Sequence, residues 1–189
     1  DNDDETSMNI YVGLEVPITL DGLSYFQYAI NISQTGGLPN TFTPSNNGWP
    51  IFLSIFFSLS EFDGIIQHMQ LQKIITIIIS SLTVIPVYFL CRKFFERNIS
   101  LIGAAIFIFE PRIIQNSLFG ITESLYLLLG TISLVLFLSS KKFIYISFGL
   151  AALLTMVRAE GLFLFFALSI LFLIKYRPNK NKNLLKFVL

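Results

Sequence analysis

Long apolar runs separated by short polar breaks fill the chain from residue 50 to residue 176. Hydropathy divides this part into membrane spans, which we expect at about 70–90, 99–117, 121–139, 143–158 and 160–176. Residues 99–109 alone are shorter than the roughly 20 residues that a helix needs to cross a bilayer. The second span must therefore continue past Glu110–Pro111, and the proline predicts a kink there.

The fold class predicted by this pattern is all-α, in the form of a polytopic membrane helix bundle. We expect three regions along the chain. Residues 1–60 form an extracytoplasmic loop that carries interfacial helices, residues 61–176 form the transmembrane bundle of five spans, and residues 177–189 form a cytoplasmic basic segment that starts a further helix.

Two short helices are expected within the first region. One covers about 21–34, with Asp21 as its N-cap, because aspartate favours that position. Its apolar side chains recur at helical spacing, so this helix can lie on a membrane surface. The other covers about 50–60, where Pro50 suits the first turn of a helix. Its run of about ten residues is too short to span a bilayer, so we expect it at the interface as well.

Composition supports the membrane assignment. Hydrophobic residues make up 53% of the chain and charged residues only 13%, whereas a soluble domain carries about 25% charged residues. With one cysteine and one histidine, the sequence offers neither a disulfide framework nor a metal-ligand cluster. We expect no metal site and no cofactor. The chain opens without Met and closes after a basic run, so we also expect a fragment, with at least one span before Asp1 and more chain after Leu189.

Charge along the chain predicts the orientation. With loop 1–60 placed outside, the inner segments hold 10 of the 13 basic residues, and 11 of the 12 acidic residues lie outside. This is the positive-inside pattern of a multi-pass membrane protein. Counting 50–60 as a span would reverse it. We expect the cell membrane of a prokaryote, with membrane lipids as partners and no nucleic acid.

A set of ionisable residues lies at the outer ends of the expected spans. It consists of Glu110, Arg112, Glu123, Arg158 and Glu160. Such residues are costly near a membrane and are often functional, and we expect all of them at the same level as Asp21. The alternative is snorkelling and simple ion pairing, for example between Glu110 and Arg112. Thr122–Glu123 also fits a helix N-terminus with an acid in its first turn.

In four places the sequence resembles the GT-C membrane glycosyltransferases, which use polyprenyl-phosphate sugars. The segments are Asp21-Gly22-Leu23-Ser24-Tyr25 followed by Gly36-Gly37; Gly48-Trp49-Pro50-Ile51 before a span that ends at Arg92-Lys93; Glu110-Pro111 followed by Ile121-Thr122-Glu123-Ser124-Leu125; and Leu153 to Gly161. Their order and spacing are similar to the branch of protein O-mannosyltransferases and aminoarabinose transferases, over the front part of such an enzyme.

This resemblance implies an inverting transfer of a sugar from a polyprenyl-phosphate donor to a hydroxyl of a protein, glycan or lipid acceptor at the outer membrane face. Asp21 would be the general base. Arg112 and Arg158, with Lys73 as a weaker third, would stabilise the leaving phosphate. The remaining substrate-binding candidates are Tyr25, Trp49, Glu110, Glu123 and Glu160. The two aromatic side chains would stack on the sugar or anchor the loop, and Glu123 and Glu160 would orient the arginines or bind sugar hydroxyls.

Two departures from the family keep alternatives open. Family members often have a second acid directly after the first, where this chain has Gly22, and the span usually found before the loop is absent. One alternative is an enzyme similar to oligosaccharyltransferase catalytic subunits, which have an acidic first loop and use a divalent metal. A transporter is another, although it predicts charged residues at mid-span, and none occurs here. A structural membrane subunit is the third.

Overall fold

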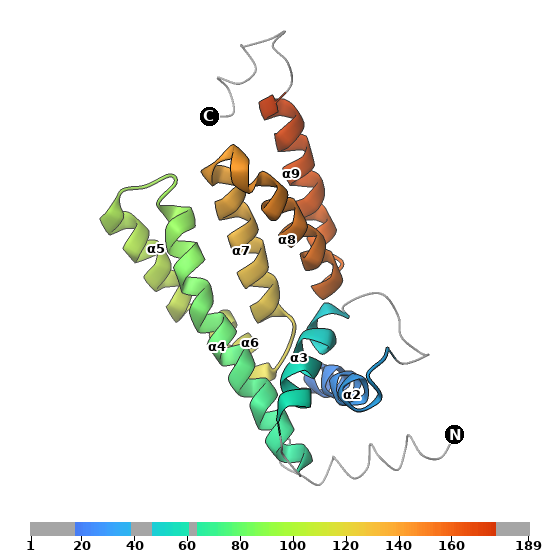
Figure 1. Ribbon diagram of the computed structural model, residues 1–189. Coiled ribbons are helices and arrows are strands. Elements are labelled where there is room, and N and C mark those ends of the chain that lie inside the picture. Colours follow the sequence, from blue (N-terminus) through green and yellow to red (C-terminus); the bar gives the residue numbers. More distant parts are fainter. Residues whose placement is uncertain (1–17, 39–46, 61–63, 177–189) are drawn as a thin grey trace.

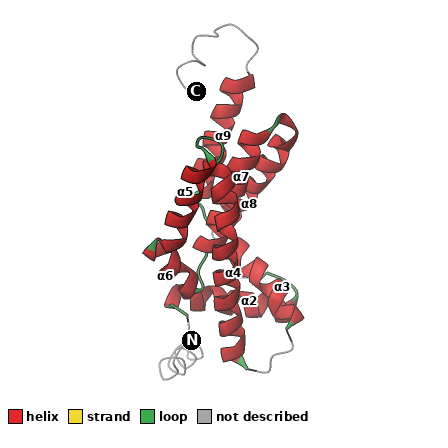
Figure 2. Ribbon diagram, turned by 90° about the vertical axis from the view of Figure 1, so that its left-hand side faces the viewer, coloured by secondary structure: helices red, strands yellow, loops and turns green. Residues whose placement is uncertain are grey.

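The computed structural model describes residues 18–38, 47–60 and 64–176. The basic segment expected at 177–189 and the first part of the expected loop lie outside these ranges. The described chain is helical throughout and contains no strand, which confirms the all-α expectation. Helices α4, α5, α7, α8 and α9 lie side by side in an elongated bundle (Figure 1). Helices α2 (Leu20–Thr35) and α3 (Gly48–Leu59) pack at one end of the bundle, beside the first half of α4 (Figure 2).

Every stretch expected as a span is helical. The bounds are α4 Ile65–Cys91, α5 Arg97–Phe109, α6 Pro111–Phe119, α7 Glu123–Ser139, α8 Ile144–Val157 and α9 Gly161–Tyr176, with a 3-10 turn at Lys141–Phe143 before α8. The second stretch is broken where the sequence predicts a kink, since α5 and α6 meet at 49°. Glu110, at the break, has extended backbone angles, because proline disfavours helical geometry in the residue before it.

The lengths of these helices matter for the span count. Among the described helices, α4 is long and apolar enough to cross a membrane, and the bent α5–α6 pair also qualifies if it is taken as one span. Helices α3, α7 and α9 are apolar but shorter. At about 1.5 Å per residue, the 17 residues of α7 reach roughly 25 Å, against a hydrocarbon core of about 30 Å.

Helix α2 covers Leu20–Thr35, and its N-cap differs from the expected one. Thr19 has the extended backbone of an N-cap, and its side-chain oxygen accepts a hydrogen bond from the Gly22 N–H. The expectation that Asp21 caps this helix was therefore wrong: Asp21 lies in the first helical turn, where its charge favours the helix dipole. Gly36 ends α2 with φ +68°, a conformation that glycine adopts without strain.

Two apolar clusters hold the bundle together. The larger one joins α2, α3 and α4 to the start of α7 and includes Phe26, Trp49 and Ile75. The smaller one joins α7, α8 and α9 around Phe137, Ala151 and Leu168. Between the two, the hydroxyls of Ser133 on α7 and Ser147 on α8 each donate to the other's carbonyl oxygen, at 3.0 and 2.8 Å. Small residues of this kind allow close helix contact in membranes.

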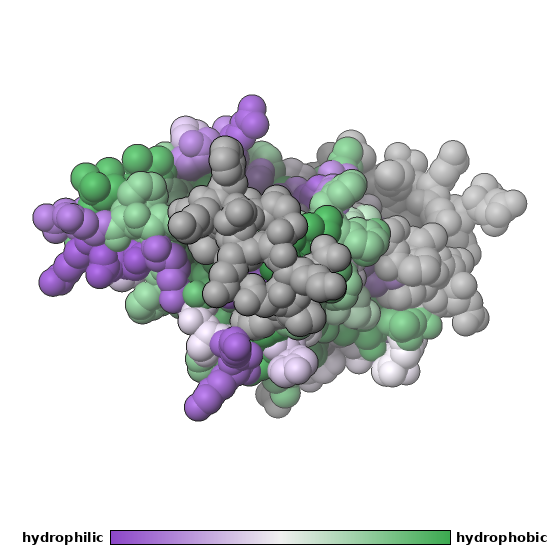
Figure 3. All heavy atoms as spheres, turned by 90° about the horizontal axis from the view of Figure 1, so that it is seen from above, coloured by the Kyte–Doolittle hydropathy of each residue, from purple (hydrophilic) through white to green (hydrophobic). Residues whose placement is uncertain are grey.

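The outer surface of the bundle is apolar along α5 and α9. Ile102 and Ile106 on α5, and Phe163 and Leu173 on α9, are all at least 60% exposed. Figure 3 looks onto the end that carries the α4–α5 turn, where hydrophobic side chains in green reach the surface beside hydrophilic groups in purple. A soluble monomer rarely exposes so many large apolar side chains together.

Candidate functional site

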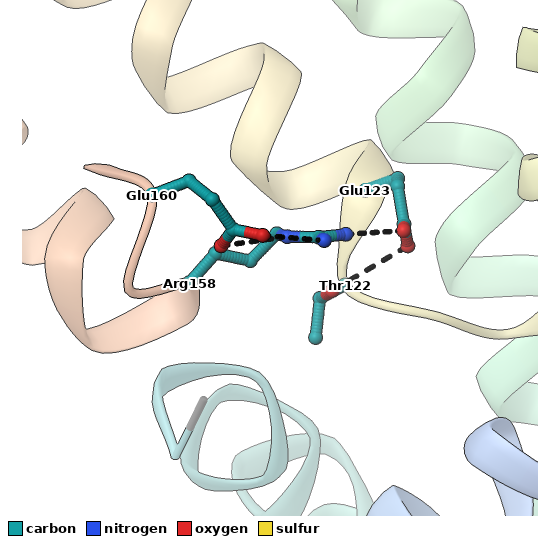
Figure 4. Close-up of polar contacts among 4 residues, drawn as sticks. All are labelled: Thr122, Glu123, Arg158 and Glu160. Carbon is teal, nitrogen blue, oxygen red and sulfur yellow. Dashed lines mark hydrogen bonds and ion pairs between the residues drawn. The ribbon is translucent and has the colours of Figure 1, made fainter. Parts of the chain in front are cut away.

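Arg158 joins two carboxylates from different helices (Figure 4). It lies in the turn between α8 and α9, and its Nη1 pairs with Oε1 of Glu123, the first residue of α7. Its Nη2 and Nε donate to the two carboxylate oxygens of Glu160, at 3.0 and 3.3 Å. Such bidentate contacts fix the plane of the guanidinium. We call Glu123, Arg158 and Glu160 the arginine cluster.

Within the arginine cluster, Arg158 and Glu160 each favour the charged form of the other. The hydrogen bonds to Glu160 and the nearby charge of Glu123 raise the pKa of Arg158, against the opposing effect of its partial burial. In turn, the hydrogen bonds from Arg158 lower the pKa of Glu160. Two carboxylates face one guanidinium, so the cluster as a whole is negative. An incoming phosphate would meet a free positive charge only if a carboxylate moved away.

Close backbone contacts position the arginine cluster. A Cβ on Gly48, the first residue of α3 (Gly48–Leu59), would lie 2.9 Å from backbone atoms of Met156 and Val157. A Cβ on Gly161 would lie 2.7 Å from the carbonyl carbon of Leu154. Larger residues at these positions would push α3 or α9 away from the end of α8. The absence of a side chain at Gly48 and at Gly161 therefore allows α3 and α9 to pack closely against the end of α8, next to Arg158.

Asp21 is exposed and stands on a helix that contacts the segment leading to the arginine cluster. The N–H and hydroxyl of Thr19 both donate to the carbonyl of Phe119, at 3.4 and 3.3 Å, so the start of α2 lies against the α6–α7 connection. That connection leads directly to Glu123. Among the described residues, no hydrogen bond or ion pair joins the carboxylate of Asp21 to another residue, the arginine cluster included.

The position after Asp21 cannot accept a side chain in this arrangement. A Cβ on Gly22 would lie 2.6 Å from the carbonyl oxygen of Phe119, closer than real contacts allow. The second acid that the resembling family often has at this position would have to displace α2 from the α6–α7 connection. Gly22 is therefore explained by the close approach of two backbones.

The two aromatic candidates differ in burial. Trp49 is fully buried, its ring stacks on Phe52, and its Nε1–H donates to the carbonyl of Gly120 at 3.2 Å. A side chain covered in this way cannot stack on a sugar, so of the two roles implied for Trp49, anchoring is the one that its burial fits. Tyr25 is half-buried and packs against the α2–α3–α4 cluster.

Glu110 and Arg112 lie apart from the arginine cluster. They stand at the α5–α6 break, and the nine residues of α6 separate them from the Gly120 turn by roughly 13 Å along the helix axis. Both are exposed, and within the described ranges they form no ion pair with each other or with other residues. The expected convergence of all the outer charges on one point is thus only partly met, because α6 holds two of them at its far end.

Sequence reasoning missed Gln72, whose amide reaches the same region from α4. Its Nε2 donates to the carbonyls of Gly22 and Gly120, at 2.9 and 2.6 Å. The available signal was a glutamine at the edge of an apolar run, but Gln67 and Gln70 carry the same signal and are exposed. Only packing distinguishes the three.

Neither a group of metal ligands among the described residues nor a similar protein was found that would identify the function of this site. Within the described ranges, no three histidine, cysteine, aspartate or glutamate side chains lie close enough together to hold a metal ion. Comparison with family models, curated proteins and solved structures found no match to this chain.

Proposed function

We propose that this chain belongs to a multi-pass membrane glycosyltransferase of the GT-C type. The enzyme takes a sugar from a polyprenyl-phosphate donor and transfers it to a hydroxyl of a protein, glycan or lipid. The observation that carries the proposal is the position of Asp21, an exposed carboxylate without a described partner. It stands on a helix that is hydrogen-bonded to the segment leading into the arginine cluster.

The membrane part of the proposal rests on the apolar outer faces of α5 and α9 and on the separation of charges between the ends of the bundle. Every described cation of the α4–α5 turn, the α7–α8 turn and the end of α9 is exposed. The starts of α2, α7 and α9, at or beside which Asp21, Glu123 and Glu160 stand, belong to the other end, together with α3 (Figure 1). Helices shorter than the hydrocarbon core are accommodated by local thinning of the bilayer.

In the proposed reaction, the acceptor oxygen attacks the anomeric carbon of the sugar and the bond to the phosphate oxygen breaks. The acceptor proton passes to Asp21, and polyprenyl phosphate leaves with the bonding electrons. One base suffices for such a single displacement, which inverts the anomeric centre. A divalent metal, as in the oligosaccharyltransferase alternative, would need a further acid near Asp21, and Gly22 does not supply one.

The leaving phosphate needs positive charge. Lys73 and Arg112 form no ion pair within the described residues, whereas Arg158 is already compensated by two carboxylates. Arg112 stands at the far end of α6, whereas Lys73 follows Gln72, whose amide binds the carbonyls of Gly22 and Gly120. We therefore assign the phosphate to Lys73 first. Arg158 holds the ends of α7 and α9 together and presents Glu123 and Glu160 to sugar hydroxyls.

The test is Asp21→Asn in the intact protein in membranes, assayed for transfer from polyprenyl-phosphate sugars. We expect transfer to fall roughly 10²–10⁴-fold while the protein accumulates normally, because a lost general base costs about that much. The matched control is Glu96→Gln, which removes an exposed carboxylate at the opposite end and should leave transfer unchanged. Unchanged transfer by the Asp21→Asn variant would remove Asp21 from the mechanism, and a wild-type protein without transfer would overturn the proposal and favour a structural subunit.

A further inference from the structure

Gln72 is the most deeply buried amide side chain among the described residues. It lies on α4, is 0% exposed, and uses its one NH₂ group to donate to two backbone carbonyls. Its carbonyl oxygen Oε1 is buried and has no hydrogen-bond partner. An unsatisfied buried acceptor lowers the stability of the fold, so stability alone would favour an apolar side chain at this position.

The two carbonyls that Gln72 binds belong to the two segments of the proposed site. Gly22 follows Asp21 directly, and Gly120 precedes Glu123 by three residues. Gly120 also accepts the indole N–H of Trp49 and has φ +73°, so this carbonyl is turned toward α4 and α3. A single side chain therefore spans the gap between the helix of Asp21 and the turn of Glu123.

Among the described hydrogen bonds, helix α2 meets the α6–α7 connection through one other residue, Thr19. It packs chiefly against α3, and its remaining described bonds to the α6–α7 connection are the long, exposed ones from Thr19 to Phe119. The bonds from Gln72 are shorter and shielded from water. Buried hydrogen bonds of this kind restrict geometry more than exposed ones, because water does not compete for the same groups.

We infer that Gln72 is a positioning residue that holds α2 and the α6–α7 connection at a fixed spacing. Its bonds set where Asp21 stands relative to Glu123. The consequence for sugar transfer rests on the proposed function, while the positioning itself does not and is measured separately.

The informative variant is Gln72→Met. Methionine has a similar length and removes both donated hydrogen bonds, but it also removes the unpaired Oε1. The carbonyl of Gly120 keeps the indole N–H of Trp49 as a donor, and loss of the unpaired Oε1 offsets part of the loss of the donated bonds, so the variant should fold. The matched control is Gln70→Met, the same change on the same helix at an exposed position.

The spacing is read out by a distance between two spin labels in the intact protein in lipid bilayers. The labels go on cysteines at Gln27 of α2 and Gln115 of α6, both exposed, after Cys91, the only cysteine of the sequence, is replaced by serine. We expect a wider distribution with a longer mean distance for Gln72→Met, and an unchanged one for Gln70→Met. A distribution for Gln72→Met that matches the wild type would overturn the inference.

Transfer kinetics separate the inference from the proposed function. Displacing a reacting group by about 1 Å can cost on the order of 10²-fold in rate, so Gln72→Met should lower kcat by about that factor with little change in the KM for the lipid donor. Loss of the spacing together with this fall in kcat supports the inference. A wild-type protein without transfer activity would remove the proposed function, and the label distances would still decide the role of Gln72.

Discussion

The two ends of the bundle handle charge in opposite ways. At the end that carries the α4–α5 and α7–α8 turns, the cations point outward and are exposed, among them Arg97 and Lys142. We call this the basic end. At the other end, which we call the mixed end, the guanidinium of Arg158 is held between two carboxylates, and the backbone beside it is closely packed.

This difference shows where tertiary structure fixes side-chain geometry. At the basic end, the charged groups are exposed and can be solvated. The exact position of each side chain there therefore matters less for the fold than its positive charge. At the mixed end, α2, α3, α6, α7 and α8 meet, and glycines such as Gly22 and Gly48 permit the contact. Substitutions should therefore have larger effects at the mixed end than the same substitutions at the basic end.

The largest expected difference between the ends is the side of the membrane on which each lies. Single cysteines at Gln27 and at Lys142, in a background where Cys91 is serine, should react with a membrane-impermeant maleimide from opposite sides of sealed vesicles. The label at the outer face should be the one at Gln27, since the positive-inside pattern predicts a cytoplasmic basic end. Labelling of both positions from one side would refute the transmembrane arrangement.

The same glycine-to-alanine change should have opposite effects at the two ends. Gly22→Ala places a methyl group 2.6 Å from the Phe119 carbonyl oxygen, and overpacking of this kind costs about 1–3 kcal/mol. At Gly149, in α8 near the basic end, an added Cβ meets nothing within 4 Å, so alanine should stabilise the helix by up to about 1 kcal/mol. Unfolding in detergent measures both, and equal effects would argue against the close contact at Gly22.

Arg158→Met should destabilise the mixed end by about 1–2 kcal/mol. Hydrogen bonds to charged groups contribute about 1.5–3 kcal/mol, and we reduce this because the side chains of Arg158 and Glu123 are still 27% and 28% exposed. Arg97→Met makes the same change at an exposed position of the basic end, where we expect less than about 0.5 kcal/mol. The comparison uses thermal unfolding in one detergent, and equal midpoints for the two variants would contradict the structural role of Arg158.

The smallest expected effect is a dependence on acidic pH that comes from Glu160. Because Arg158 lowers the pKa of Glu160 below its ordinary value of 4.5, this pair stabilises the fold above that pH. The contribution is lost as the pH falls through the lowered pKa of the folded state. Glu160→Gln should therefore flatten the fall in unfolding temperature between about pH 5 and pH 3. Glu96→Gln controls for loss of an exposed carboxylate, and identical profiles for Glu160→Gln and wild type would exclude the contribution.

Much of the helix content could be predicted from the sequence because it depends on local properties. The apolar runs, the proline after Glu110 and the glycine pair after Thr35 determine where helices run, bend and end. The N-cap of α2 could not be read in this way. Thr19 and Asp21 are both good cap residues, and the difference lies in which of them contacts Phe119 across the fold.

The candidate site, too, was predicted in part from local sequence and was decided in part by packing. Sequence alone singled out Glu123, Arg158 and Glu160 as charges at the edges of apolar runs, since a charge there is costly unless it is paired or functional. That these three meet, while α6 keeps Glu110 and Arg112 away, depends on how the bent α5–α6 pair packs along α4. Gln72 differs from Gln70 only in the face of α4 that it occupies, and the contact of Gly22 with Phe119 joins segments about a hundred residues apart. Such contacts depend on the packing of whole helices, which no local pattern of residues encodes.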